Sequence, residues 1–180
     1  PAQDETNIGF GEAEACNIGR DVKDSNTPID GYLAEVHFID GQALTQASFG
    51  KTDAATNQWK PIEVTGLTYG TNGFYQKYSS TELAASFTDS AEGQVITANG
   101  DVHTDTSVKK IGTASAQFDG TGDYLSTASL GMGLTGDYTI ECWFYTSSST
   151  SDNGIISNKY NNSSFNGNFS LRLNDGGNSN

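Results

Sequence analysis

Two stretches of alternating side chains, joined by a glycine-rich segment, constrain the fold of this chain more than any other feature. In the first stretch, Ala114, Ala116 and Phe118 alternate with polar residues, and in the second, Tyr138–Tyr145, apolar residues occupy every other position. Successive side chains of a β-strand point to opposite faces, so this pattern predicts half-buried strands. The sequence DGTGD at 119–123 follows the first stretch. Its residues tolerate a positive φ, which predicts a tight turn.

A third alternating stretch lies much earlier in the chain, in the sequence DGYLAEVHFIDGQAL at 30–44. The pattern predicts one face with Tyr32, Ala34, Val36 and Phe38, and another with Leu33, Glu35, His37 and Ile39. Both faces are partly apolar, which is typical of a strand that is covered on both sides. Asp-Gly dipeptides bracket this strand, and they predict a turn at each end.

Length and charge exclude several classes of protein. The chain has 180 residues, which is enough for one β-sandwich but too short for two complete ones. Its net charge is −13, because 22 acidic residues outnumber nine Lys and Arg. Such a chain is poorly suited to bind a phosphate backbone or an anionic membrane surface. We also find no apolar run of about 18 residues that would predict a membrane span.

The amino-acid sequences of these segments resemble those of a known family. The sequences KKIGTASAQFDGTGDYLS (109–126), DYTIECWFY (137–145) and DGYLAEVHFIDGQAL (30–44) are similar to laminin-G-like, concanavalin-A-like jelly rolls. These domains recur in secreted adhesion proteins and in tailed-phage virion proteins. The resemblance implies an all-β fold, a jelly-roll (concanavalin-A-like) β-sandwich. In the family, a sequence like 109–145 belongs to the opening, N-terminal half of a domain, and a sequence like 30–44 forms its closing, C-terminal strand.

The order in this chain is therefore closing strand first and opening half second. The resemblance implies that residues 1–50 are the C-terminal strands of a first laminin-G-like jelly roll. Residues 51–70 would be a connector, and residues 71–180 the N-terminal portion of a second jelly roll. Three explanations stay open: a fragment of a longer protein with tandem domains, one sandwich closed in permuted order within the chain or between subunits, or a misleading resemblance at one end.

Two aspartates are candidate calcium ligands. Asp119 and Asp123 flank the glycine-rich turn. Carboxylate oxygens on a flexible loop suit Ca²⁺, and the resemblance implies that such sandwiches often hold calcium at a rim loop. The alternative is that both side chains stabilise the turn by accepting hydrogen bonds from the backbone. Apart from calcium, we expect no cofactor.

Three aromatic residues are candidate contacts for a carbohydrate. Trp143 and Tyr145 share a face of their predicted strand, and Tyr124 lies at the edge of the nearby turn. Sugar sites combine exposed aromatic rings with polar groups. The alternative is that Trp143 and Tyr145 pack between the sheets, where an aromatic ring buries a large area.

Catalytic patterns are weak. Glycoside hydrolases need a pair of carboxylates at a cleft, but Glu35 and Glu141 each stand alone on their predicted strands. His37 and His103 have no partner in the sequence that predicts a nucleophile. We therefore expect a protein that is not an enzyme. The remaining hydrolase hypothesis would require Glu35.

The resemblance implies a non-enzymatic structural or adhesive module of a phage virion, in a tail, fibre or appendage. Its expected partners are copies of itself, other virion proteins and a host-surface glycan, and its expected location is the virion or the extracellular space. The competing expectation is a soluble calcium-dependent carbohydrate-binding module of a secreted or surface protein.

Overall fold

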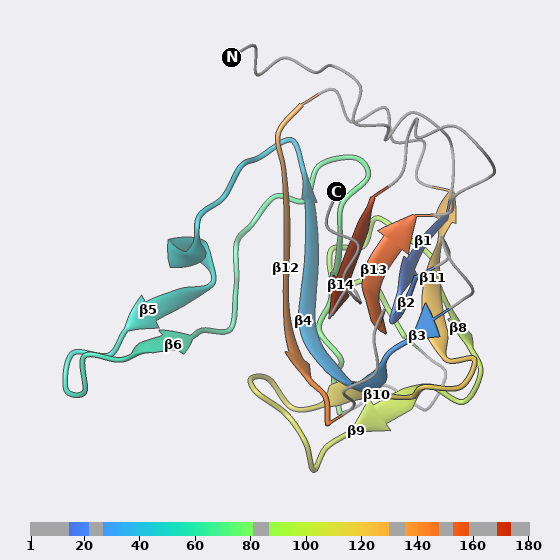
Figure 1. Cartoon of the computed structure of the whole chain (residues 1–180). Helices are drawn as coiled ribbons and strands as arrows, with labels where there is room; N and C mark the ends of the chain where they lie inside the picture. The colour runs from blue at the N-terminus through green and yellow to red at the C-terminus, as the bar shows by residue number, and fades with distance from the viewer. Residues whose placement is uncertain are drawn as a thin grey trace, which may run out of the picture.

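The structure, a computed structural model, describes residues 15–21, 27–80, 87–129, 136–147, 153–158 and 169–173. These residues form an all-β protein of antiparallel strands (Figure 1). Their only helical element is a short 3₁₀ turn, η1 (Gln46–Ser48). Among them, no helix has the length and hydropathy that a membrane span requires.

Two larger sheets contain most of the strands that the structure describes. The first has the spatial order β14 (Ser170–Leu173), β13 (Asn153–Asn158), β1 (Ala15–Ile18), β11 (Tyr124–Ser129) and β8 (Ile96–Asn99). The second has the order β12 (Tyr138–Tyr145), β4 (Asp30–Asp40), β10 (Ser115–Asp119) and β9 (His103–Asp105), with β7 (Phe74–Gln76) also paired to β4. Two-stranded pairs are formed by β2 (Arg20–Asp21) with β3 (Thr27–Pro28) and by β5 (Gly50–Thr52) with β6 (Trp59–Pro61).

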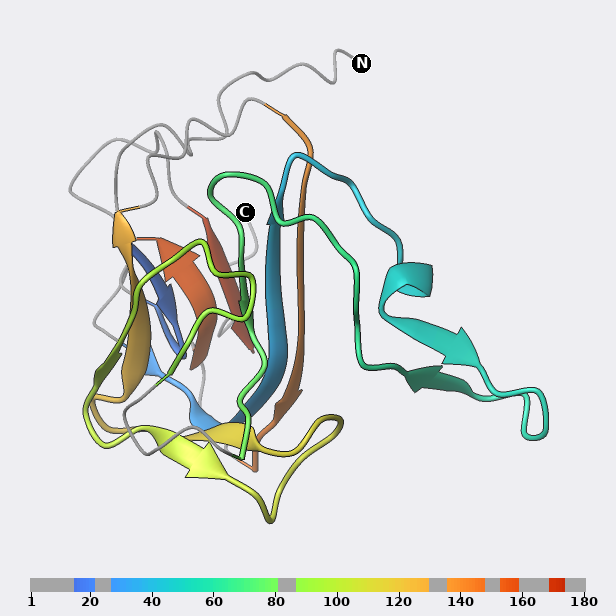
Figure 2. The ribbon, with the colours of Figure 1, turned by 180° about the vertical axis from the view of Figure 1, so that it is seen from behind.

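The two larger sheets face each other, as Figures 1 and 2 show from opposite sides, and the main hydrophobic core lies between them. The first sheet contributes fully buried residues such as Ile18 and Leu125, and the second contributes Leu33, Phe38 and Phe118. Burial of apolar side chains on two facing sheets is the main favourable term in a fold of this kind. The arrangement is compatible with a β-sandwich.

Strand β4 connects parts of the chain that are far apart in sequence. Along one edge it pairs with β12 over most of its length, from Tyr32 opposite Tyr145 to Asp40 opposite Tyr138. Its other edge pairs with β10 and β7. In the first sheet, β1 likewise lies between β11 and β13. Strands from 1–50 and from 71–180 therefore share both sheets, as expected for the permuted sandwich. The assignment of these ranges to tandem domains of a longer protein stays a prediction.

The alternation expected for β4 changes phase in the middle of the strand. Glu35 has a φ of +51°, and the pairing with β12 is irregular between Glu141 and Trp143. Such a bulge places two residues of one strand opposite one of the other. As a result, the core contains Leu33 before the bulge and Val36 and Phe38 after it. The single-phase faces predicted for this strand are wrong, because sequence alternation assumes an uninterrupted pleat.

Residues 51–70, predicted as a connector, belong to a longer segment, 41–70, which contains a hairpin of β5 and β6 that projects from the second sheet (Figure 2). We call this segment the arm. Near its two ends, Phe49 and Val64 pack with Ile39 of β4 in a small second core. Pro61 ends β6, at a position where a hairpin strand tolerates the missing N–H. The arm thus covers part of the outer face of the second sheet.

Candidate functional site

An open pocket lies where the start of β4 meets the end of β12. Its volume is about 300 Å³, and we call it the aromatic pocket. Its walls include Tyr32, Trp143 and Tyr145, together with Lys109 and Lys110 from the segment before β10. Residues paired across antiparallel strands point to the same face, so the pairing of Tyr32 with Tyr145 sets two of these rings side by side. Their centroids are 6.1 Å apart.

The aromatic side chains of the pocket differ in exposure. Tyr145 is 62% exposed, whereas Trp143 is half-buried. The ring of Trp143 lies 5.5 Å from that of Trp59 on the arm, and the Lys110 Nζ lies 5.7 Å from its centroid. These contacts hold Trp143 between the arm and the segment that carries Lys109 and Lys110, which we call the lysine segment. The sequence-predicted residues Trp143 and Tyr145 therefore line one pocket and are not packed between the two sheets.

Tyr124 lies elsewhere. It belongs to β11 in the first sheet, and the Arg20 guanidinium carbon is 3.3 Å from its ring centroid. Such a cation–π contact covers the ring face that a sugar would need. The structure does not bring Tyr124 to the aromatic pocket.

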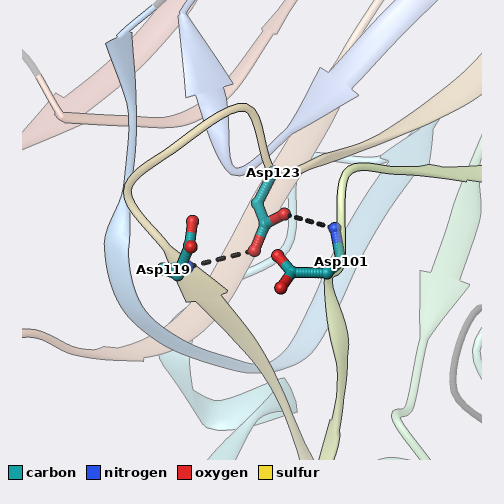
Figure 3. Close-up of side chains that lie close together, drawn as sticks. All are labelled: Asp101, Asp119 and Asp123. Carbon is teal, nitrogen blue, oxygen red and sulfur yellow. Dashed lines mark hydrogen bonds between the residues drawn. The ribbon is translucent and has the colours of Figure 1, made fainter.

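Asp119 and Asp123 lie at the glycine-rich turn that follows β10, close to a third acid, Asp101 (Figure 3). One carboxylate oxygen from each of the three lies within 4.8 Å of the others. Asp123 is 1% exposed, and its two oxygens accept hydrogen bonds from the backbone N–H of Asp101 at 2.8 Å and of Asp119 at 3.1 Å. Asp119 in turn accepts a bond from the Thr121 N–H at 2.7 Å.

This aspartate triad fits both interpretations made from the sequence. Carboxylate oxygens are the ligands that Ca²⁺ takes, so three of them in one loop cluster could contribute to a calcium site. The hydrogen bonds explain the same residues without an ion, because those within 119–123 close the turn with side-chain acceptors and the bond from the Asp101 N–H ties the chain before β9 to that turn. Gly120 and Gly122 both have a φ of +80°, as the predicted tight turn requires. The sequence did not single out Asp101, since two strands, β9 and β10, lie between it and the turn.

A buried polar cluster lies on the outer face of the second sheet, beneath the arm. Glu35 and His37 from β4 are 1% and 0% exposed, and Glu141 from β12 is directly opposite His37. Tyr75 from β7 donates a hydrogen bond to the Glu35 Oε2, and its ring stacks on His37 with centroids 4.2 Å apart. The hydroxyl of Tyr69 lies 2.8 Å from the His37 Nδ1.

Three atoms of this buried polar cluster have no hydrogen-bond partner among the described residues. They are the Glu35 Oε1, the His37 Nε2 and the Glu141 Oε2. Burial raises the pKa of Glu35, and burial together with the charge of Glu35 raises the pKa of Glu141 to about 7. Burial also lowers the pKa of His37 to about 4. At neutral pH the histidine is uncharged, and Glu141 is close to half protonated.

Sequence reasoning missed this cluster. The two glutamates were expected to stand alone, and the pairing of β4 with β12 brings them to one face. Alternation along 30–44 placed Glu35 and His37 on one face. Nothing in that segment or in 137–145 indicates that the two strands pair. Both cysteines are free thiols: Cys16 belongs to the main hydrophobic core, and Cys142 packs against it.

Comparison with protein-family models, with curated proteins and with solved structures found no match to this chain. The geometry of the sites therefore carries the functional argument.

Proposed function

We propose that this chain is a non-enzymatic adhesive module of a phage virion, with a jelly-roll sandwich fold, which binds a surface glycan through the aromatic pocket. The single observation that carries the binding role is the pocket itself. Tyr32, Trp143 and Tyr145 converge on an open hollow of about 300 Å³, and Tyr145 is 62% exposed. Exposed aromatic rings beside polar groups are what a pyranose ring needs in order to stack and to be oriented.

The covered position of the two glutamates supports a role without catalysis. A glycosidase must bring a carboxylate pair into contact with the scissile bond. Glu35 is 1% exposed, and the Tyr75 hydroxyl already donates to it. Tyr69 and Phe49 of the arm stack near His37 on the same face, with ring centroids 6.0 Å and 5.4 Å from it. In this proposal Glu35 and Glu141 therefore have a structural role beneath the arm.

The virion assignment rests on the resemblance of the 30–44 and 109–145 segments to phage proteins. Appendages of this kind are symmetric, so the proposal includes a homo-oligomer on the virion, in contact with other virion proteins. Strands β8 and β9 end their sheets within the described part of the chain, and an unpaired strand edge can pair with another copy. Light scattering coupled to size exclusion tests this part: a strictly monomeric chain at high concentration would contradict it.

The binding role is tested by a glycan array, followed by calorimetric titration of the best-bound sugars. Replacing Trp143 by Ala should weaken binding by about tenfold or more, since a Trp at the centre of a site carries a large share of the binding energy. Tyr145→Phe keeps the ring and should retain most of the affinity. Absence of binding to any glycan, with the wild-type chain folded by circular dichroism, would refute the binding role.

The alternative is a soluble calcium-dependent carbohydrate-binding module of a secreted or surface protein. It differs in requiring calcium at Asp101, Asp119 and Asp123, which lie close together where the chain passes from β8 to β9 and from β10 to β11. The same titrations are repeated with Ca²⁺ and with a chelator. Glycan binding that disappears with the chelator, and in Asp119→Ala, would favour the alternative. Binding that is unaffected by either change favours the aromatic pocket acting alone.

A further inference from the structure

We propose that the ligand of the aromatic pocket is an acidic sugar, whose carboxylate is held by Lys110 and Lys109 while its ring packs against the aromatic walls. This inference rests on the proposed function and adds the chemical class of the glycan. A uronic acid or a sialic acid combines a pyranose ring with a carboxylate and fits this description.

The first argument is the local sign of the charge. The whole chain carries −13, with only nine Lys and Arg. The lining of the aromatic pocket nevertheless includes two lysines and no acidic residue. A positively charged site on a strongly acidic protein favours an anionic ligand, because a neutral one gains no charge–charge attraction from the lysines.

The second argument is that the charges of these lysines are not neutralised by an ion pair within the described part of the chain. Three other cations there are in ion pairs: Lys60 with Asp53, Lys77 with Glu63, and Arg172 with Asp21. Lys109 and Lys110 are exposed and form no ion pair with a carboxylate of the described residues. Their charges are therefore available to a bound carboxylate.

The third argument is that the lysines are positioned. The Ser115 Oγ donates a hydrogen bond to the Val108 carbonyl at 2.5 Å, which ties the lysine segment to the start of β10. The Lys109 Nζ donates to the Thr106 carbonyl at 2.5 Å. The Lys110 Nζ lies 5.7 Å from the ring centroid of Trp143, so one charge stands directly beside an aromatic wall. An ammonium held in place costs less entropy on binding than a free one.

A ring with a carboxylate explains both halves of this pocket. The aromatic walls from β4 and β12 provide area for the apolar face of a pyranose, and the ammonium groups provide the partner for its charge. A free inorganic anion would leave the aromatic rings uncovered, and a neutral sugar would leave the lysine charges without a counter-charge. An acidic sugar is the ligand class that contacts the three rings of Tyr32, Trp143 and Tyr145 and also pairs with the two lysines.

The test compares sugars that differ only in charge. Trigalacturonate and N-acetylneuraminic acid are titrated calorimetrically into the full chain, each beside its neutral methyl ester. We expect the acids to bind more tightly than their esters by about tenfold, and Lys110→Ala to reduce acid binding by about fivefold without changing ester binding. Raising the salt concentration to about 0.5 M should also weaken acid binding, because exposed charge pairs are screened.

The matched control is Lys51→Ala, which removes the same charge from an exposed lysine on β5 that does not line the pocket. It should leave acid binding unchanged. If Lys51→Ala weakens binding as much as Lys110→Ala does, only the net charge matters and the inference is wrong. If esters or neutral glycans bind as tightly as the acids, and Trp143→Ala still abolishes binding, the proposed function stands and the acidic specificity is overturned. If neither acids nor neutral glycans bind, both fail.

Discussion

Strands β4 and β12 present one continuous outer face, and its two ends are built in opposite ways. At one end, Glu141 and His37 lie opposite each other beneath the arm, within the buried polar cluster. At the other end, Tyr145 and Tyr32 lie opposite each other in the open aromatic pocket. The covered end buries carboxyl and imidazole groups among its rings, and the open end leaves aromatic rings exposed, which is the reverse of the usual distribution.

This reversal indicates which end has a structural role and which end is available to a ligand. Burying three polar atoms without partners is costly, and the arm can cover them only because Phe49, Val64 and Ile39 bury apolar area beside them. Leaving aromatic rings exposed also loses burial energy, and a ligand that covers them would recover it. The bulge at Glu35 separates the two ends.

The largest predicted effect is a contrast in stability between the two ends. Tyr75→Ala removes a buried ring that stacks on His37 and donates to Glu35, and it should cost about 3–5 kcal/mol of unfolding free energy. Tyr145→Ala removes an exposed ring and should change stability by no more than about 0.5 kcal/mol. Urea denaturation followed by tryptophan fluorescence measures both. Equal losses in the two variants would remove the distinction between the ends.

A smaller effect is the pH dependence of stability, which the covered end should dominate on the alkaline side. The folded pKa of Glu141 is about 7, above the ordinary glutamate value of 4.5, so the folded state retains a proton that the unfolded chain releases. Stability therefore falls as pH rises from about 4.5 to about 7. Glu141→Gln should flatten this limb and, after allowance for partial solvent screening, gain about 1–2 kcal/mol at pH 8 relative to the wild type.

On the acid side, His37 acts in the opposite direction. Its folded pKa of about 4 lies below the ordinary histidine value of 6.5, so the unfolded chain takes up a proton in a pH range where the folded state does not. The stability that the neutral imidazole contributes is fully present above pH 6.5 and is lost as pH falls toward 4. This window overlaps that of Glu141 with the opposite sign, so the two contributions largely cancel between about pH 4.5 and 6.5 in the wild type, and urea melts of Glu141→Gln between pH 4 and pH 8 should reveal the acid limb of His37. Substitution of the exposed His103 by Gln is the control and should leave the acid limb in place.

The smallest predicted effect concerns the bulge that divides the face. Glu35 adopts a φ of +51°, a conformation that costs an L-residue about 1 kcal/mol and glycine little. Glu35→Gly should therefore be about 1 kcal/mol more stable than Glu35→Ala, although glycine weakens an ordinary strand. The comparison of the two variants cancels the loss of the carboxylate. An alanine variant as stable as the glycine variant would show that the bulge relaxes.

Local sequence patterns predicted the strands at 30–40, 115–119 and 138–145 and the turn at 119–123, because each depends on neighbouring residues. They placed Trp143 and Tyr145 on one face, which the structure retains. They could not place Tyr32, Lys109 and Lys110 in the same pocket, since that depends on the pairing of β4 with β12 and with β10.

The bulge was the other feature that the sequence did not predict. A glutamate at a positive φ within a strand has no sequence signature, and the apolar residues on both faces of β4 fit either phase of the alternation. The Glu35–Glu141 neighbourhood then follows from long-range pairing alone. Asp101 likewise lies beside Asp119 and Asp123 only because distant strands pair, which the sequence did not indicate.

The central claim is that ligand binding belongs to the open end of the β4–β12 face and not to its covered end or to the aspartate triad. Chemical-shift mapping of the ¹⁵N-labelled chain during titration with trigalacturonate or N-acetylneuraminic acid tests it most directly. We predict shifts of the Trp143 indole and of the backbone amides of Tyr32, Lys110 and Tyr145, with His37 unchanged. Shifts confined to 119–123 or to the arm, or no shifts at ligand concentrations in the millimolar range, would contradict the account.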